Sequence, residues 1–333
     1  MKESPYYKQH SDGKVECTLC EFRCILKNNQ KGICSVRQNI DGKLFSLNYG
    51  KVVALSPDPV EKKPLFHFQP GSFSFSIACQ GCNFSCQNCQ NWQTSQQFNE
   101  STDEIKDFNL ILQLAEKYRC SSLSYTYSEP TIYAETALET AKIGAKAGLK
   151  NIFVTNGYES SELLNEMEGL IHGANIDLKS FSKKFYKKVC GGVDVNKVLK
   201  NIELFIEKNI WVEITTLVIP GKNDSTEELR DIASFIAGLG KHIPWHVSAF
   251  HPTYKMLDSN NTPLKTLINA REIGLKEGLK YVYQGNIPGG GGENTFCSHC
   301  NELLIERLHF QIISNRLIEN KCPHCKTSLE GVF

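Results

Sequence analysis

The chain has 333 residues, and its 37 basic and 36 acidic side chains leave a net charge of only +1. This balance disfavours a nucleic-acid partner, which usually requires a strongly basic face, without excluding one. No stretch approaches about 18 consecutive apolar residues, and the first ten residues lack the apolar run of a signal peptide. We therefore expect a cytoplasmic protein with no membrane contact, built as one large domain with small additions.

Fourteen cysteines are the compositional feature that points to chemistry. In a chain without a secretory signal, cysteines indicate metal binding or catalysis rather than disulfides. The first cluster has the spacing C-x2-C-x3-C-x9-C and consists of Cys17, Cys20, Cys24 and Cys34. This irregular spacing fits either a zinc ion, which we prefer, or a second iron–sulfur cluster.

The second cluster is the most informative one, with Cys82, Cys86 and Cys89 spaced C-x3-C-x2-C. An iron–sulfur cube fully ligated by protein takes four thiolates. Three thiolates on one tight loop would hold three irons and leave the fourth open, as an open position marks a catalytic zinc. Cys79 also permits a closed four-cysteine site for zinc or an electron-transfer cluster. We interpret Cys79 instead as a buried thiol at a strand end.

Short β-rich runs alternate with amphipathic helical patterns between residues 72 and 283. The predicted strands are 72–78, 121–127, 152–155, 174–178, 211–219, 245–250 and 281–283. The predicted helices start at Thr102–Glu104, which offers a cap and an acidic first turn, and then cover 131–147, 195–206, 229–239 and 264–277. This order predicts a parallel sheet with right-handed crossovers, either doubly wound or closed toward a barrel.

The third cluster consists of two C-x2-C pairs, Cys297 with Cys300 and Cys322 with Cys325. This pattern is close to a zinc ribbon, so we expect zinc in a closed structural site, with a rubredoxin-type iron as the alternative. The glycine-rich run 288–292 reads as a hinge that could let this module fold over the end of the sheet. We expect three parts: residues 1–60, 61–292 and 293–333.

Several of these features together resemble one family. They are the three cysteine clusters, the stretch 58–68, the Gln90-Asn91-Trp92 that follows the central loop, and the ending Gly331-Val332-Phe333. The chain resembles the AmmeMemoRadiSam-system radical S-adenosylmethionine (SAM) enzymes, relatives of the pyruvate formate-lyase activating enzymes. The resemblance implies an α/β fold, specifically a partial (β/α)6 barrel with small cysteine-rich metal modules at both ends. It also implies a [4Fe–4S] cluster and SAM as cofactors.

Residues just after the strands then become site candidates, because chemistry in such barrels sits at the C-terminal ends of the strands. Glu129 matches a motif that contacts the amino group of SAM, although Tyr127 and Ser128 replace its two glycines. Thr155 and Asn156 follow the next strand at a position that contacts the cofactor in related enzymes.

Two further strand ends carry candidates. Asp177 and Lys179 point to the same side of their strand, where they could bind ribose hydroxyls and the methionyl carboxylate of SAM. His251 is the candidate at the barrel mouth, near the adenosine, with a catalytic or cofactor-binding role. His246, five residues earlier, should face the opposite side and be packed. Cys190 stands alone, and we interpret it as a small buried hydrophobe rather than a hydrogen-atom donor.

The resemblance implies that the open iron binds SAM and that one electron cleaves it to a 5′-deoxyadenosyl radical. That radical would abstract hydrogen from an unknown substrate, by kinship a glycyl radical protein. The alternatives are a small molecule or RNA base as substrate, or a non-catalytic iron–sulfur and zinc adaptor. The expected partners are a reductant such as ferredoxin or flavodoxin and, by resemblance only, Memo-like and AMMECR1-like proteins.

Overall fold

A computed structural model describes residues 1–98, 104–287 and 291–333 of the chain. Its centre is an eight-stranded sheet in the order β14-β13-β12-β11-β10-β9-β8-β7. The strands are β7 (Val52–Pro59), β8 (Phe73–Cys79), β9 (Ser122–Tyr125), β10 (Lys150–Thr155), β11 (Gly173–Asp177), β12 (Trp211–Val218), β13 (Trp245–Ala249) and β14 (Val282–Gly285). Strands β8 to β14 are parallel, and β7 pairs antiparallel with β8.

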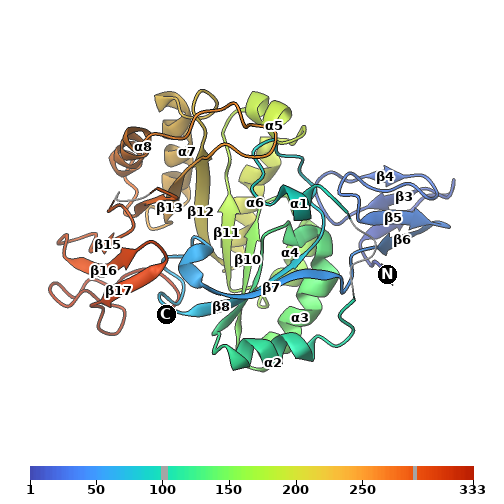
Figure 1. Ribbon diagram of the computed structural model, residues 1–333, viewed down its shortest axis with the longest axis horizontal. Coiled ribbons are helices and arrows are strands. Elements are labelled where there is room, and N and C mark those ends of the chain that lie inside the picture. Colours follow the sequence, from blue (N-terminus) through green and yellow to red (C-terminus); the bar gives the residue numbers. More distant parts are fainter. Residues whose placement is uncertain (99–103, 288–290) are drawn as a thin grey trace.

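The sheet forms an open barrel, because neighbours in sequence are neighbours in space and the pairing stops at β7 and β14. Figure 1 shows the sheet curving around the molecule, with helices packed along its outer side. The predicted α/β partial barrel is thus confirmed. All seven predicted strands exist, and the antiparallel β7 is an addition that the β-then-α pattern did not reveal.

The covering helices are amphipathic, and α4, α6 and α7 begin at side-chain caps. They are α2 (Asn109–Lys117), α3 (Ala134–Lys146), α4 (Ser161–Met167), α6 (Val195–Glu207), α7 (Thr226–Leu239) and α8 (Leu264–Lys276), with the shorter α1 (Trp92–Ser95) and α5 (Lys183–Val189) near the cysteine loop. The Ser160 hydroxyl accepts from the Leu163 amide at 3.1 Å, and the Ser225 hydroxyl accepts from Glu228 at 3.2 Å. Their apolar faces meet the sheet in one continuous core.

The helix predicted to start at Thr102 begins instead at Asn109, so that start is wrong. Thr102 and Asp103 lie outside the described residues, and 104–107 are not helical. The Ile105 amide donates to the Gly50 carbonyl at 2.8 Å. This bond attaches the segment around Ile105 to the residues just before β7 and keeps it out of the helix. The Asp107 carboxylate accepts from the Asn109 amide at 2.9 Å, just before the helix, whose N-cap residue Phe108 offers no side-chain cap.

The N-terminal cysteines lie in a region of short strands at one end of the barrel (Figure 1). Its two three-stranded sheets are β1-β6-β5 and β2-β3-β4. The strands are β1 (Lys2–Glu3), β2 (Tyr7–Gln9), β3 (Val15–Cys17), β4 (Ile25–Leu26), β5 (Arg37–Ile40) and β6 (Lys43–Ser46). Arg37 pairs with Glu135 of α3, and both side chains are nearly fully buried, so this region is fixed to the barrel.

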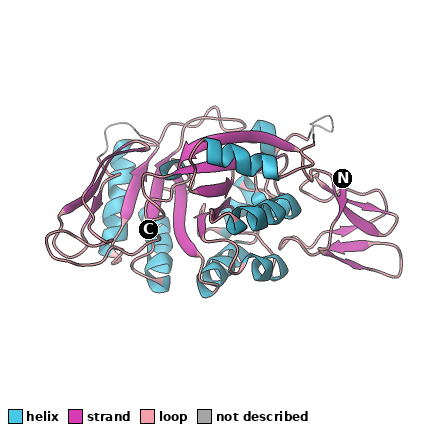
Figure 2. Cartoon of the chain, turned by 90° about the horizontal axis from the view of Figure 1, so that it is seen from below, coloured by secondary structure: helices cyan, strands magenta, loops and turns pink. Residues whose placement is uncertain are grey.

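The C-terminal cysteines lie at the opposite end of the molecule, as the views in Figures 1 and 2 both show. Strands β15 (Thr295–Phe296), β16 (Leu303–Leu308) and β17 (Gln311–Asn315) form an antiparallel sheet there. The chain end returns to the barrel: the Val332 amide donates to the His67 carbonyl at 2.8 Å, and the Gln69 amide donates to Val332 at 2.6 Å. Among the helices within the described ranges, none has the length and apolar character needed to span a bilayer.

Candidate active site

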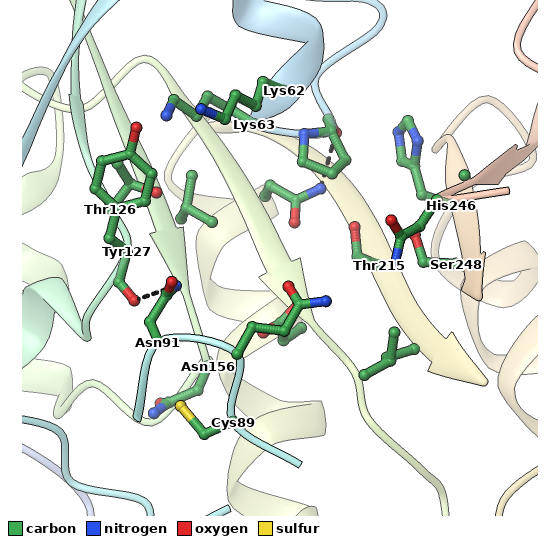
Figure 3. A pocket seen from close by; sticks show the side chains of 18 of the residues that line it. Lys62, Lys63, Cys89, Asn91, Thr126, Tyr127, Asn156, Thr215, His246 and Ser248 are labelled. Atoms are coloured by element: carbon green, nitrogen blue, oxygen red, sulfur yellow. Dashed lines mark hydrogen bonds between the residues drawn. The ribbon is translucent and has the colours of Figure 1, made fainter. Parts of the chain in front are cut away.

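A cavity of about 760 Å³ opens where the parallel strands end. It brings together the three central cysteines and every predicted cofactor contact: Cys82, Cys86, Cys89, Glu129, Thr155, Asn156, Asp177, Lys179 and His251 all line it. In Figure 3, Cys89 and Asn156 lie at one end of this cavity, and Lys62 and Lys63 lie at the other. The volume falls within the range of small-molecule and cofactor sites.

The cysteine loop leaves β8 through a glycine that the packing requires. Gly81 has φ +104°, and a Cβ there would lie 2.9 Å from Val36 and 3.1 Å from the Cys34 carbonyl oxygen. On its other side the loop is held by backbone bonds, because the Ser85 amide donates to the Cys190 carbonyl at 3.2 Å. The loop is therefore clamped between the N-terminal region and the end of α5.

Two other cysteines near the loop differ from each other. The Cys79 thiol is buried next to the Thr136 hydroxyl of α3 and does not line the cavity, which agrees with its interpretation as a buried strand-end residue. Cys190 is buried as predicted, but its thiol also interacts with the Cys86 thiol, and this interaction lowers the pKa of Cys86. The sequence offered no signal for this contact, because Cys190 lies about a hundred residues away.

Glu129 is fixed by hydrogen bonds to the next strand end. Its carboxylate accepts from the Asn156 amide at 2.8 Å, from the Thr155 hydroxyl at 2.8 Å and from the Thr131 hydroxyl at 2.6 Å. Sequence reasoning missed Glu159, whose carboxyl group lies within hydrogen-bond distance of the same two hydroxyls, those of Thr155 and Thr131. Burial raises the pKa of Glu159 to about 8, and the neighbouring charge of Glu129 adds to the rise.

Asp177 and Lys179 form an ion pair at 2.7 Å at the end of β11. Burial opposes the charge of Lys179, but Asp177 and then Cys86 raise its pKa well above the ordinary value. The pair therefore presents one carboxylate and one ammonium to the cavity beside the cysteine loop. Both side chains line the cavity, although β11 ends at Asp177 and Lys179 follows the strand.

The two histidines do not face opposite sides as expected, because both line the cavity. The strand β13 ends at Ala249, so the alternation of sides that the prediction assumed stops before His251. His251 is exposed and bonds Asn261 Oδ1 at 2.8 Å and the Asn286 carbonyl at 3.0 Å. His246 is packed as predicted, and its Nε2 lies 2.7 Å from the buried carboxylate of Glu213.

Comparison with known proteins assigns this arrangement to a family. Residues 76–236 match the model of the radical SAM superfamily. The chain belongs to the radical SAM superfamily. An uncharacterized protein of Methanocaldococcus jannaschii is 42% identical to it over 100% of both chains. Because members of this superfamily are enzymes, the hypothesis of a non-catalytic adaptor loses its support.

Two other likenesses are more distant. A second M. jannaschii protein, provisionally named as a glycyl-radical enzyme activating enzyme, is 28% identical over 50% of this chain and 70% of its own length. The crystal structure of Streptococcus suis SuiB bound to S-adenosylmethionine aligns with a TM-score of 0.53 at 16% identity. That alignment covers 69% of this chain and 53% of SuiB, and it shows the fold alone.

The radical SAM family implies a [4Fe–4S] cluster and SAM, and the cavity residues fit both. Buried polar atoms at the cysteine end have no partner within the described chain, namely Asn83 Nδ2, Asn88 Oδ1 and Asn156 Oδ1. Thr215 Oγ1 and Gln284 Nε2, elsewhere on the cavity wall, are also unpartnered. Buried polar groups are rarely left unpaired in folded proteins, so a polar ligand filling this cavity is the expected source of their partners.

The largest group of site residues missed by sequence reasoning lies in the stretch 58–68. Asp58 accepts from Lys62 at 2.7 Å and from Lys63 at 2.8 Å, and both lysines line the cavity. Burial lowers the pKa of Lys63 to about 8. The buried Glu213 carboxylate holds the following segment by accepting from the Phe66 amide at 2.9 Å. The adjacent lysines were the available signal, but nothing in the sequence placed them opposite the cysteine loop.

The C-terminal module also contributes to the cavity wall, through Glu293 and the hairpin residues His309 and Phe310. This agrees with the expectation that the module folds over the barrel mouth, although hinge residues 288–290 lie outside the described residues. Arg307 fixes the hairpin by donating to the Phe66 carbonyl at 2.8 Å and to Thr295 at 2.7 Å.

The four C-terminal thiols already form a compact group. The sulfurs of Cys297 and Cys325 lie 3.5 Å apart, those of Cys300 and Cys322 lie 3.6 Å apart, and all four lie within 4.8 Å of one another. Four thiolates around one zinc at about 2.3 Å have sulfurs about 3.8 Å apart. The geometry therefore suits a single tetrahedral ion with no open position.

We expect the Cys297→Ala variant to lose one metal ion per chain and to melt earlier, because structural zinc contributes directly to folding free energy. The β15–β17 sheet should become sensitive to protease while the barrel stays resistant. Metal analysis, thermal melting and limited proteolysis measure these effects. The Cys120→Ala variant is the control, because Cys120 is a lone buried thiol, and equal metal content in both variants would contradict the assignment.

The pair Glu129 and Glu159 predicts a pH dependence of stability. Because burial raises the pKa of Glu159 from 4.5 to about 8, the folded protein keeps a proton there that the unfolded chain releases. This contribution is complete below about pH 4.5 and is lost as pH rises through 8. Denaturant melts of the metal-free protein from pH 5 to 8 should show a decline that the Glu159→Gln variant lacks. Parallel declines in both proteins would contradict this assignment.

Proposed function

We propose that this protein cleaves SAM reductively at a [4Fe–4S] cluster held by Cys82, Cys86 and Cys89, and that it abstracts hydrogen from a substrate in the same cavity. When bound, the cluster and SAM supply the 5′-deoxyadenosyl radical. The observation that supports this proposal is that the three thiols and the predicted SAM contacts line one cavity at the ends of the parallel strands.

The chain's own residues bind and orient SAM in this proposal. The Glu129 carboxylate, fixed by three hydrogen-bond donors, accepts from the methionyl ammonium. Asp177 accepts from ribose hydroxyls, and Lys179 donates to the methionyl carboxylate. Asn156, whose Nδ2 donates to Asn83 at 2.7 Å, keeps the strand end against the cysteine loop. His251 borders the adenosine side at the mouth of the cavity.

The substrate has two candidate classes. The likeness to a protein provisionally named as a glycyl-radical enzyme activating enzyme favours a protein substrate. The far end of the cavity favours a polar small molecule, because Lys62 and Lys63 share the single carboxylate of Asp58 there. An ammonium group that shares one carboxylate with a second ammonium group can still bind a carboxylate or phosphate of a ligand. The sequence resemblance thus supports a protein substrate, and the geometry of the cavity supports a small polar substrate.

We further propose that the chain works within the AmmeMemoRadiSam system, with a ferredoxin or flavodoxin as reductant and Memo-like and AMMECR1-like proteins as partners. The resemblance of residues 58–68 to that family supports this assignment, and Lys62, Lys63 and Phe66 of this stretch line the cavity. We also propose zinc at the C-terminal thiols, and the division of the chain into 1–60, 61–292 and 293–333. Strand β7 lies in the first part but completes the central sheet.

The matched carboxylates Glu129 and Glu159 test the SAM assignment. Both are buried and both lie within hydrogen-bond distance of the Thr155 hydroxyl, but only Glu129 lines the cavity. Glu129→Gln should weaken SAM binding by about 10- to 100-fold, since a charge-assisted hydrogen bond contributes roughly 1.5–3 kcal/mol. Glu159→Gln should leave SAM affinity close to that of the parent protein. Equilibrium dialysis of SAM against the anaerobically reconstituted proteins measures both.

Two outcomes would contradict the proposal. SAM affinity that is unchanged in Glu129→Gln would remove Glu129 from the binding site. The absence of any 5′-deoxyadenosine when the parent protein receives SAM and dithionite would remove the reaction itself. Binding of a labelled glycyl radical protein, compared with that of small carboxylates and phosphates, then separates the two substrate classes.

A further inference from the structure

We propose that Cys17, Cys20, Cys24 and Cys34 hold a second [4Fe–4S] cluster, not zinc, and that this cluster passes one electron to the central site. This goes beyond the proposed function, which requires a cluster only at the central loop. Three observations carry it: the spacing of the thiols, the shared motif of the two cysteine loops, and the contacts between those loops.

The spacing of the N-terminal thiols differs from that of the C-terminal ones. Among the described residues, Cys297, Cys300, Cys322 and Cys325 are the one group of three or more ligand side chains that all fall within 4.8 Å of one another. The N-terminal thiols exceed that span, and so do the central thiols. A cube places its ligands on separate irons, so its sulfurs stand farther apart than those around a single ion.

The N-terminal thiols nevertheless gather in one region of the fold. The Cys17 amide donates to the Cys24 carbonyl at 2.9 Å, and the Arg23 amide donates to the Cys20 carbonyl at 3.1 Å. A Cβ on Gly32, two residues before Cys34, would lie 3.8 Å from the Cys24 sulfur. The four cysteines are therefore neighbours in the fold, although among the described residues their sulfurs do not all fall within 4.8 Å of one another.

The two cysteine loops share a short motif, and their aromatic residues meet. Cys20-Glu21-Phe22-Arg23-Cys24 and Cys82-Asn83-Phe84-Ser85-Cys86 are both C-x-F-x-C. The rings of Phe22 and Phe84 lie edge to face with centroids 6.5 Å apart. Tyr158 packs against both, at 4.9 Å from Phe22 and 5.4 Å from Phe84. The aromatic residue of each loop thus lies between the two thiol sites.

The backbones of the two sites are also in contact. A Cβ on Gly81, directly before Cys82, would lie 3.1 Å from the carbonyl oxygen of Cys34. Cys24 is half-buried while Cys17, Cys20 and Cys34 are buried, so one edge of the N-terminal site reaches solvent. This arrangement suits a relay that accepts an electron at the surface and delivers it inward to the central loop.

The electron balance is simple. A low-potential one-electron donor of the ferredoxin or flavodoxin class is oxidised by one electron, and the N-terminal cluster is reduced by it. The N-terminal cluster then returns to its oxidised state as the central cluster gains the same electron. No covalent bond forms or breaks in this transfer, and no proton is needed.

Iron counting in the full-length chain tests the second cluster independently of activity. A variant with Cys82, Cys86 and Cys89 all changed to alanine, reconstituted anaerobically with iron, sulfide and zinc, should keep about four irons per chain. Its reduced electron paramagnetic resonance signal should not respond to SAM. The complementary variant Cys17→Ser with Cys34→Ser should also keep about four irons, whose signal does respond to SAM. A triple variant that holds no iron would overturn the proposal.

Kinetics test the relay. In the Cys17→Ser and Cys34→Ser double variant, 5′-deoxyadenosine formation driven by reduced flavodoxin should fall at least tenfold. Formation driven by dithionite, a small donor, should fall much less. A content of one zinc per chain at the C-terminal site shows that the double variant is folded. If the double variant lacks this zinc, the single variant Cys24→Ser, at the half-buried edge of the N-terminal site, replaces it. An unchanged flavodoxin-driven rate after loss of the N-terminal iron would overturn the relay.

Discussion

Changing Cys82, Cys86 and Cys89 together to alanine should abolish 5′-deoxyadenosine formation, with the product below detection under conditions where the parent protein turns over. These thiols are the protein ligands of the central cluster in the proposed function, and all three line the cavity. Each single substitution should have nearly the same effect, because a cluster with two protein ligands is not held in place for SAM. Chromatographic assay of 5′-deoxyadenosine with SAM and dithionite measures the loss.

The control for this experiment is Cys79→Ala, three residues before the loop. The Cys79 thiol is buried against Thr136 rather than facing the cavity, so this variant should keep its central iron and its activity. Loss of central iron in Cys79→Ala would restore the closed four-cysteine interpretation of the loop. Product formation that survives in the triple alanine variant would contradict the proposed function directly.

Arg37→Met should lower the free energy of unfolding by about 3–5 kcal/mol, because it leaves a buried carboxylate without its partner. Arg37 is 1% exposed and donates through Nη2 to Glu135 at 2.6 Å and to the Ile132 carbonyl at 2.8 Å. This pair joins the N-terminal strands to α3 of the barrel. Denaturant unfolding of the reconstituted protein, followed by circular dichroism, measures the loss.

Arg23→Met is the matched control. Arg23 also forms a two-pronged pair, with Glu162 at 2.7 and 2.6 Å, but both side chains remain partly exposed. Exposed pairs contribute roughly 0–1 kcal/mol, so this variant should unfold almost like the parent protein. Equal losses in the two variants would show that burial does not set the strength of the Arg37 pair.

Most strands and helices of the sheet were predictable because they carry their own local signals, whereas the choice of a barrel over a doubly wound sheet came from the family resemblance. Each predicted strand is a short run of β-forming residues, and the site candidates followed once chemistry was placed at strand ends. Glu129, Asn156 and Lys179 were found in this way, and all three line the cavity. Helix α4 (Ser161–Met167) was not predicted. The start of α2 was placed wrongly, because a better-looking cap at Thr102 competed with the bond from Ile105 to Gly50.

Contacts between distant segments could not be predicted in the same way. The Cys190 thiol meets Cys86, and Glu159 shares Thr155 with Glu129, through pairings that only the folded chain creates. Lys62 and Lys63 follow the end of β7, the antiparallel edge strand that was not predicted, so the search at the ends of the parallel strands did not reach them. The local sequence pattern indicates which helix or strand a segment forms. Contacts between distant segments depend on where the folded sheet places those segments.

The C-terminal module forms one wall of the cavity and packs against Phe66, Tyr281 and Tyr283 of the barrel region. It contributes Glu293, His309 and Phe310 to the lining, while the residues proposed to bind SAM belong to the barrel. Because these three residues lie outside the barrel, their identity can change without altering the residues proposed to bind SAM. We therefore expect natural variants of this enzyme to differ in what they act on chiefly through the β16–β17 turn, and exchange of that turn between homologues to transfer selectivity.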